Sequence, residues 1–134
     1  MTSRFLLDTH ILVWWLTAPH KLSSAQDGVL KRIIAGNETV AVCAITFIEI
    51  SFLLRHGKTR LRIPLEKLLR QIDESPVITV LPLISEIALD VASLIGTLRE
   101  PADCTIVATA RVHALRLLTS DQRIIQSKLV PVIE

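Results

Sequence analysis

The 134-residue chain has no tyrosine, and its aromatic residues are three phenylalanines and two tryptophans. Proteins that bind single-stranded nucleic acid by stacking on the bases usually present several aromatic side chains for this purpose. We therefore expect any contact with a nucleic acid to depend on the charged backbone of that ligand more than on its bases. The net charge of +2 is too small to indicate a nucleic-acid partner by itself.

Cysteine is also scarce, and long apolar runs are missing from the sequence. The two cysteines, Cys43 and Cys104, lie far apart within apolar segments, so we expect buried, reduced thiols rather than a disulfide or a zinc site. Only three apolar residues lie between the polar start of the chain and Asp8, which is too few for a signal peptide. No apolar stretch reaches about 18 residues, so we expect no membrane span and a cytoplasmic protein.

The signature motifs of several enzyme classes are missing as well. The four glycines are scattered, so the sequence has no glycine-rich phosphate loop, and it has no Gly-x-Ser-x-Gly motif. A phosphoaspartyl phosphatase would need a second aspartate two residues after Asp8, where His10 stands. The four histidines lack metal-ligand spacing with one another or with the cysteines, and we expect structural or surface roles for them. They are His10, His20, His56 and His113.

What the chain does contain is enough apolar sequence for one folded domain, residues 1–134. Half of the residues are hydrophobic and 21% are charged, which argues against disorder. Short runs rich in valine, isoleucine and leucine predict strands at 4–7, 39–44, 77–81, 115–119 and 130–133. These runs are continuous rather than alternating, as in strands of a parallel sheet that are buried on both faces.

Segments with helical patterns lie between the predicted strands. We expect helices from near residue 11 and at 24–35, 46–56, 85–98 and 101–113, one that begins at Pro64, and a short one through residue 125. Ser24–Asp27 resembles a capping box, and Gly36 and Gly57 are suited to end their helices. Strands that alternate with helices of this length predict a layered α/β fold with right-handed crossovers.

Four acidic residues stand at the end of an apolar run or just inside the helix that follows it. Asp8 and Asp121 directly follow predicted strands, and we expect Glu49 and Asp103 in the first turns of their helices. In open α/β sheets, ligands bind beyond the carboxyl ends of the strands, so the four can converge there. Clustered carboxylates suit Mg²⁺ or Mn²⁺, and metal-assisted phosphodiester hydrolysis is the best chemical fit.

A simpler interpretation applies to each acid taken alone. Asp8 and Asp121 are suited to cap the helices that follow them, and Glu49 and Asp103 are suited to complement a helix dipole. Capping does not by itself predict that several strands share an acidic edge. Glu100, one turn before Asp103, is a further candidate for the same site.

The segments around these acids also match a known family. They are LLDTHILVWWL at 6–16, IEIS at 48–51, REPADCTIVATA at 99–110 and LTSD at 118–121. In this order and spacing, and over essentially the whole chain, the sequence resembles the PIN-domain ribonucleases and specifically the VapC toxins of toxin–antitoxin pairs. The resemblance implies a three-layer α/β/α fold with a central parallel sheet of strand order 3-2-1-4-5.

The resemblance also implies an activity and partners. It implies a metal-dependent endoribonuclease in which the four acids bind one or two Mg²⁺ or Mn²⁺ ions, with Asp8, Asp103 and Asp121 as direct ligands. Glu49 would complete a second metal position or orient the attacking water. Thr9 and Thr119 would hydrogen-bond to the ligand carboxylates or to water, with Glu100 nearby. The implied partners are an RNA substrate, a cognate antitoxin protein and a second copy of the chain in a homodimer.

The sequence departs from the family pattern at several positions. Leu53 stands where a lysine is frequent, Glu100 replaces an aspartate, and Ala102 and Cys104 replace a phenylalanine and an arginine. Cations that could compensate are Arg55, Lys58, Arg60, Arg62 and Arg99. Because the departures bear on substrate binding and rate, a PIN-like module that binds RNA or protein without cleavage remains an alternative. A nuclease that acts on DNA is another.

The adjacent Trp14 and Trp15 should point about 100° apart on a helix, so one can lie in the core while the other lies at the surface. The helix that carries them and the helix at 46–56 are rich in apolar residues. The resemblance implies that these helices form a groove for an antitoxin segment and a homodimer surface, whereas a buried core is the simpler explanation.

Overall fold

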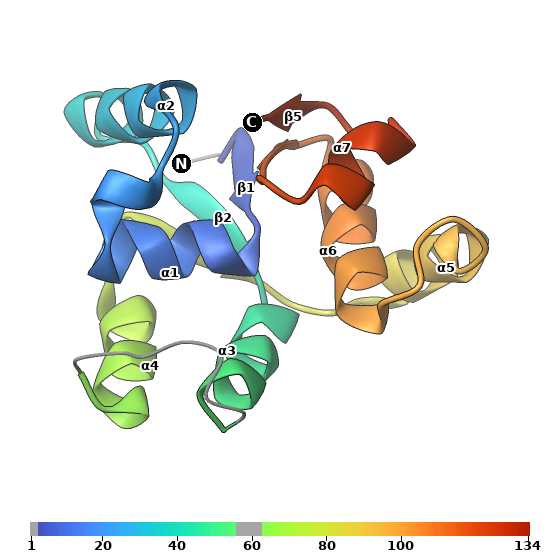
Figure 1. The fold of residues 1–134 in the computed structure, drawn as a ribbon, viewed down its shortest axis with the longest axis horizontal. Helices are drawn as coiled ribbons and strands as arrows, with labels where there is room; N and C mark the ends of the chain where they lie inside the picture. The colour runs from blue at the N-terminus through green and yellow to red at the C-terminus, as the bar shows by residue number, and fades with distance from the viewer. Residues whose placement is uncertain (1–2, 56–62) are drawn as a thin grey trace.

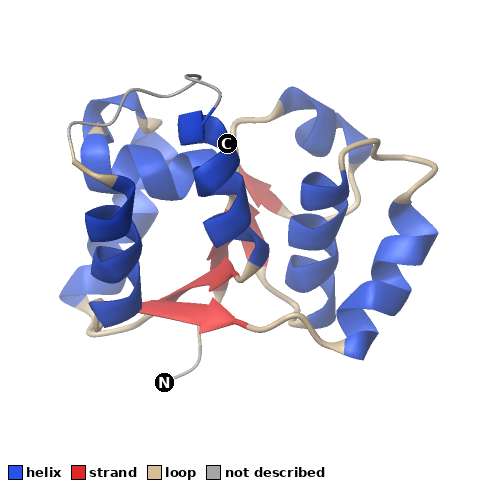
Figure 2. Cartoon of the chain, turned by 90° about the horizontal axis from the view of Figure 1, so that it is seen from below, coloured by secondary structure: helices blue, strands red, loops and turns tan. Residues whose placement is uncertain are grey.

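A computed structural model describes residues 3–55 and 63–134 of the chain. Its five strands form one all-parallel sheet in the order β3-β2-β1-β4-β5 (Figures 1 and 2). The strands are β1 Phe5–Leu7, β2 Val40–Cys43, β3 Ile78–Leu81, β4 Arg116–Leu118 and β5 Val132–Ile133. The predicted fold class and strand order are therefore confirmed.

Helices cover both faces of this sheet, which makes the fold three-layered. The helices are α1 Thr9–Thr17, α2 Ser24–Ala35, α3 Ile45–Arg55, α4 Leu65–Glu74, α5 Ser85–Leu94, α6 Pro101–Val112 and α7 Gln122–Ser127, with a 3₁₀ turn at Pro19–Lys21. Figure 1 shows α1, α2 and α4 on one side of the sheet and α5, α6 and α7 on the other. Within the described residues, no helix is long and apolar enough to cross a membrane.

The core consists of two apolar clusters, one on each side of the sheet. Leu6 and Leu117 belong to the cluster beneath α5, α6 and α7, whereas their neighbours Leu7 and Leu118 belong to the cluster beneath α1, α2 and α4. Successive side chains of a strand point to opposite faces, so a strand segment that helices cover on both faces is apolar at consecutive positions. This explains the continuous apolar runs of the sequence.

The register of the strands brings their carboxyl ends to one edge. Leu7 pairs with Val42 on one side and with Leu118 on the other. Beyond this last pair, the backbone N–H of Asp8 still donates to the carbonyl oxygen of Leu118 at 3.0 Å. The residues that follow β1, β2 and β4 therefore begin side by side at this edge of the sheet.

Some local predictions were wrong. The capping box lies one residue earlier than predicted: the Ser23 hydroxyl accepts from the Gln26 N–H, and the Gln26 side-chain oxygen accepts from the Ser23 N–H. Helix α5 ends at Leu94 rather than near residue 98, because the chain turns there. Trp14 and Trp15 are both partly buried against the same cluster, so neither lies fully in the core or at the surface.

The expectation for the cysteines holds, that for Pro64 is off by one residue, and others lie outside the described residues. Cys43 and Cys104 are free and buried, as expected. Pro64 is the N-cap of α4 rather than its first residue. His56 and Gly57, where we expected the third helix to end, belong to the segment 56–62 that the structure does not describe.

Candidate functional site

The four acids of the sequence analysis come from four different elements that meet at the carboxyl edge of the sheet. Asp8 and Asp121 are the N-caps of α1 and α7, and Asp103 lies in the first turn of α6. Glu49 lies in the second turn of α3 rather than the first, because α3 begins at Ile45. Capping and convergence are thus compatible: Asp8 and Asp121 cap their helices and still lie near the other acids.

The electrostatic effects among these carboxyl groups show how near they are to one another. Burial is the largest cause that raises the pKa of Asp103, and repulsion by Asp8, Asp121 and Glu49 raises it further, to about 7. Burial also raises the pKa of Glu49, and the charges of Asp8 and Glu100 add to this effect. A group of carboxyls that disfavour one another's charge is stabilised either by protonation or by a nearby cation.

Asp8 is held rigidly at the end of β1. Its side chain is only 4% exposed. One oxygen, Oδ1, accepts from the Thr9 N–H at 2.8 Å, and the other, Oδ2, accepts from the Thr119 hydroxyl at 2.7 Å. The Thr119 hydroxyl in turn accepts from the Asp121 N–H at 3.1 Å. Thr119 therefore connects the first acid of the chain to the last.

Glu49 is positioned by a second pair of hydroxyl groups. The Thr9 hydroxyl donates to Glu49 Oε1, which orients the carboxylate of α3 toward the end of β1. Thr46, buried on α3, lies 3.0 Å from the Thr9 hydroxyl, and it must be the donor because Thr9 donates to Glu49. Thr9 and Thr119, both expected near the acids, thus hydrogen-bond to carboxylates.

His10 belongs to this site although the sequence analysis assigned it a structural or surface role. Its Nε2 accepts from the Ser120 N–H at 3.0 Å, so Nδ1 carries the proton of the neutral ring. That nitrogen lies 3.6 Å from Asp8 Oδ2. The ring also packs edge-on against Trp14. Metal-ligand spacing could not reveal this role, because His10 contacts the backbone of a residue 110 positions away.

Gln26 is a second residue that sequence reasoning missed at this site. Its side chain is fully buried, and Nε2 lies 3.2 Å from the Ser120 hydroxyl and 3.3 Å from each of the carbonyl oxygens of Thr119 and Ile133. The same amide also closes the capping box with Ser23. Gln26 and His10 therefore both hold the segment that leads to Asp121.

Arg123 is the third such residue, and it contacts two acids directly. Its Nη2 lies 3.1 Å from Asp121 Oδ2 and 3.7 Å from Asp103 Oδ2. Burial alone would raise the pKa of Asp121, but hydrogen bonds and charge from Arg123 outweigh burial and hold that pKa below its usual value.

The cations that the sequence analysis suggested are placed differently from Arg123. Arg55 and Arg99 are exposed, and neither forms an ion pair with an acid in the described part of the chain. Lys58, Arg60 and Arg62 lie outside the described residues.

A pocket of about 420 Å³ opens beside the acids, between α3 and the start of α6. Glu49 and Glu100 contribute to its lining, together with the exposed apolar side chains of Ile48 and Phe52. Leu53, Glu100 and Ala102, three of the positions that depart from the family pattern, all line this pocket. Three departures therefore alter one wall of the candidate site.

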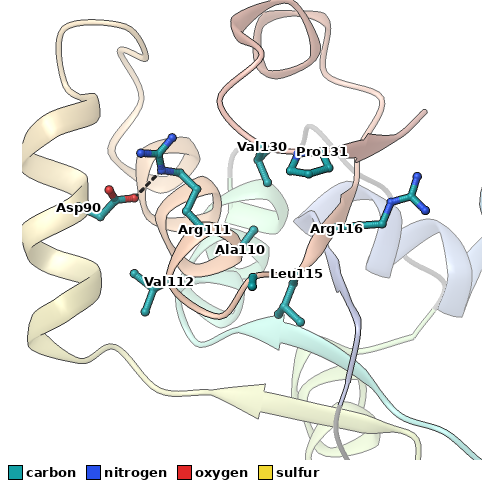
Figure 3. Close-up of a pocket in the computed structure, with 9 residues that line it drawn as sticks. Asp90, Ala110, Arg111, Val112, Leu115, Arg116, Val130 and Pro131 are labelled. Carbon is teal, nitrogen blue, oxygen red and sulfur yellow. Dashed lines mark hydrogen bonds and ion pairs between the residues drawn. The ribbon is translucent and has the colours of Figure 1, made fainter.

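A larger pocket, of about 510 Å³, lies near the start of β4, away from the edge that carries the acids (Figure 3). Arg111 on its wall points toward Asp90 of α5, with Nε 2.9 Å from Asp90 Oδ2, whereas Arg116 points away from this pair. Since Arg111 is already paired and Arg116 diverges from it, the two cations do not form one binding site.

The four carboxylates match a hard divalent cation in chemistry but not in their present orientation. Among the described residues, no three histidine, cysteine, aspartate or glutamate side chains are arranged to hold a metal ion as they stand. The acids are instead turned toward donors of the protein, as in the pair of Asp121 with Arg123. Oxygen ligands, burial and mutual repulsion nonetheless fit Mg²⁺ or Mn²⁺, provided that side chains reorient.

The sequence is similar to one protein family and to a known protein. The model of the PIN domain matches residues 5–128. Ribonuclease VapC22 of Mycobacterium tuberculosis is 32% identical over 120 residues, which cover 89% of this chain and 88% of the relative.

Solved structures agree with this result. FitAcB from Neisseria gonorrhoeae superposes with a TM-score of 0.67 at 25% identity, over 97% of this chain and 96% of that one. VapBC2 from Rickettsia felis, bound to a DNA fragment from its promoter, gives a TM-score of 0.70 over 96% of each chain. At 16% identity, the latter similarity concerns the fold alone.

Proposed function

Because this chain belongs to the PIN domain family, we propose that it is a metal-dependent endoribonuclease and the toxin of a toxin–antitoxin pair, with residues 1–134 as a single domain. The observation that carries the proposal is the convergence of Asp8, Glu49, Asp103 and Asp121 at one edge of the sheet. Their mutual repulsion, which helps to raise the pKa of Asp103 to about 7, supports a site that takes up a cation.

In this proposal, Asp8, Asp103 and Asp121 hold one or two Mg²⁺ or Mn²⁺ ions, and Glu49 completes a second position or orients the attacking water. A bound ion would stabilise the negative charge that develops on the phosphodiester group during hydrolysis. Thr119 fixes the orientation of Asp8 through the hydrogen bond to Oδ2, and Thr9 does the same for Glu49 Oε1. Such support of ligand carboxylates maintains metal affinity.

We propose an RNA substrate, a cognate antitoxin and a homodimer as the partners of this chain, acting in the cytoplasm. The curated relative is named a ribonuclease. Exposed apolar side chains next to the acids, with Ile48 54% and Phe52 60% exposed, support a protein partner on this side of the molecule.

Cleavage assays with variants of the acids test the proposal. Purified protein should cleave structured RNA in Mg²⁺, and folded Asp8→Asn and Asp103→Asn variants should lose this activity. If both variants cleave RNA as fast as the wild type, the assignment of these acids as catalytic residues is wrong. The same assay with DNA distinguishes a ribonuclease from a nuclease that prefers DNA.

A second candidate function is a module that binds RNA or protein without cleaving it. The observation in its favour is that Leu53, Glu100 and Ala102, which depart from the family pattern, line the pocket beside the acids. Calorimetry with Mn²⁺ separates the two functions. Specific binding that disappears in Asp121→Asn supports the enzyme, whereas no binding at millimolar Mn²⁺ supports the module.

A further inference from the structure

Arg123 places one guanidinium group against two carboxylates that come from different elements. Nη2 lies 3.1 Å from Oδ2 of Asp121, which follows β4, and 3.7 Å from Oδ2 of Asp103, in α6. Nε lies 3.4 Å from Asp121 Oδ1. Among the described residues, Arg123 is the only arginine or lysine in an ion pair with any of the four acids.

The two sides of this contact differ strongly in their exposure. The side chain of Arg123 is 68% exposed, whereas those of Asp103 and Asp121 are 15% and 19% exposed. Ion pairs with an exposed partner are weak, because water solvates the charge almost as well as the protein does. Arg123 can therefore leave the two carboxylates at little cost.

The backbone of residue 123 has a separate role that does not depend on the side chain. Its N–H donates to Asp121 Oδ1 at 2.9 Å and so completes the cap of α7. A substitution that removes only the guanidinium group leaves this hydrogen bond in place.

A divalent cation and the guanidinium group need the same oxygen atoms. If a cation were bound by Oδ2 of both Asp103 and Asp121, Arg123 in its present position would be within a few ångströms of a like charge. Such proximity is unfavourable in a partly buried site, where screening is weak. The metal ion and the guanidinium group therefore exclude each other. This explains why the two carboxylates suit a metal ion chemically but are arranged around Arg123 instead.

We propose that Arg123 is a displaceable counter-ion that competes with the divalent cation for Asp103 and Asp121. The inference rests on the proposed metal-dependent function. It makes Arg123 a positioning residue, which holds the two carboxylates when no metal is bound and turns outward when the cation enters.

Calorimetric titration of the RNA-free protein with Mn²⁺ tests this competition, in anaerobic buffer at pH 8, where Asp103 is largely ionised. Arg123→Ala should bind Mn²⁺ roughly threefold or more tightly than the wild type, because the competitor is gone. The matched control is Arg4→Ala: Arg4 is 70% exposed and pairs with Glu38 at 3.0 Å, near the start of β1. Its Mn²⁺ affinity should equal that of the wild type.

Two outcomes of the titration overturn the inference but not the proposed function. In the first, the wild type binds Mn²⁺ but Arg123→Ala does not bind it more tightly. This outcome leaves the proposed function intact. The other is an equal gain in Arg4→Ala, which would make the effect one of net charge. If neither the wild type nor Arg123→Ala binds Mn²⁺ at millimolar concentration, the proposed metal-dependent function fails together with the inference.

An NMR measurement reports the displacement itself. The Nε–H resonance of Arg123, assigned by its absence from Arg123→Lys, should shift when Mg²⁺ is added, as the group leaves Asp121. A resonance that stays unchanged at saturating Mg²⁺ contradicts the displacement, whatever the affinities are.

Discussion

The hydroxyl group of Thr119 lies 2.7 Å from Asp8 Oδ2 and joins two residues that are 111 positions apart in sequence. It spans the paired ends of β1 and β4, and it is fully buried. Because the same hydroxyl accepts from the Asp121 N–H, one small side chain sets the relative positions of two candidate metal ligands.

We predict that Thr119→Val weakens Mn²⁺ binding by about 10–100-fold, because losing a hydrogen bond to a ligand carboxylate has effects of this size. Thr119→Ser retains the hydroxyl and should restore most of the affinity. Thr79→Val, at an exposed position of β3, is the matched control and should change nothing. Calorimetry measures all three, and undiminished affinity in Thr119→Val would contradict the role of this hydroxyl.

We predict that Gln26→Met destabilises the fold by about 1–3 kcal/mol, since it leaves buried partners of the amide without a hydrogen bond. Urea unfolding gives the free energy of unfolding. Gln122→Met, at the exposed start of α7, should change it by no more than about 0.5 kcal/mol. If both substitutions change the free energy of unfolding equally, the buried hydrogen bonds of Gln26 contribute no more to stability than an exposed amide does.

We predict that Asp103 makes the metal-free protein less stable as pH rises. Its pKa of about 7 in the folded state lies above the ordinary value of 3.8, so between these pH values the folded state binds more protons than the unfolded state. The contribution of Asp103 to the free energy of unfolding is therefore fully present below about pH 4 and is lost as the pH rises through about 7. In EDTA, the Tm of Asp103→Asn should exceed that of the wild type at pH 8, and the difference should shrink toward pH 4.5. A difference that does not depend on pH would contradict this.

We predict that Leu53→Lys strengthens binding to RNA. Position 53 lines the pocket that also contains Glu49 and Glu100, so a cation there adds a phosphate contact beside the acids. The slope of log affinity against log salt should steepen by about 0.7 for single-stranded RNA, as expected for one further phosphate contact. Fluorescence anisotropy in an Asp8→Asn background, which suppresses cleavage, measures the slope. The control is Leu89→Lys, at an exposed position of α5. Leu54→Lys is unsuitable as a control because Leu54 packs against the core.

The acids could be found from the sequence because their positions follow from the fold class. A parallel sheet requires continuous apolar strands, and whatever follows those strands, such as Asp8 and Asp121, must meet at one edge. The start of α3 was predicted one residue too late, because no capping signal marks Ile45, and this one residue moves Glu49 from the first turn to the second.

Apart from Thr9 and Thr119, the residues that support the acids could not be found in the same way. His10, Gln26 and Arg123 carry no spacing signal, since each role depends on the direction of a side chain. Gln26 lies within the predicted capping-box segment and does complete the box with Ser23, but its amide also reaches a residue 94 positions away. Trp14 and Trp15 show the same limit: the angle between neighbours on a helix does not say how much of each ring the rest of the protein covers.

The hydrogen bond between Thr119 and Asp8 also bears on the order in which the chain is synthesised. On the ribosome, β1 emerges long before β4, so Asp8 and Glu49 are present in a nascent chain that still lacks Thr119 and Asp121. Even after α6 has added Asp103, such an intermediate lacks the fourth acid and the support from the last strands. The complete acidic site can therefore form only after β4 and the start of α7 have been synthesised.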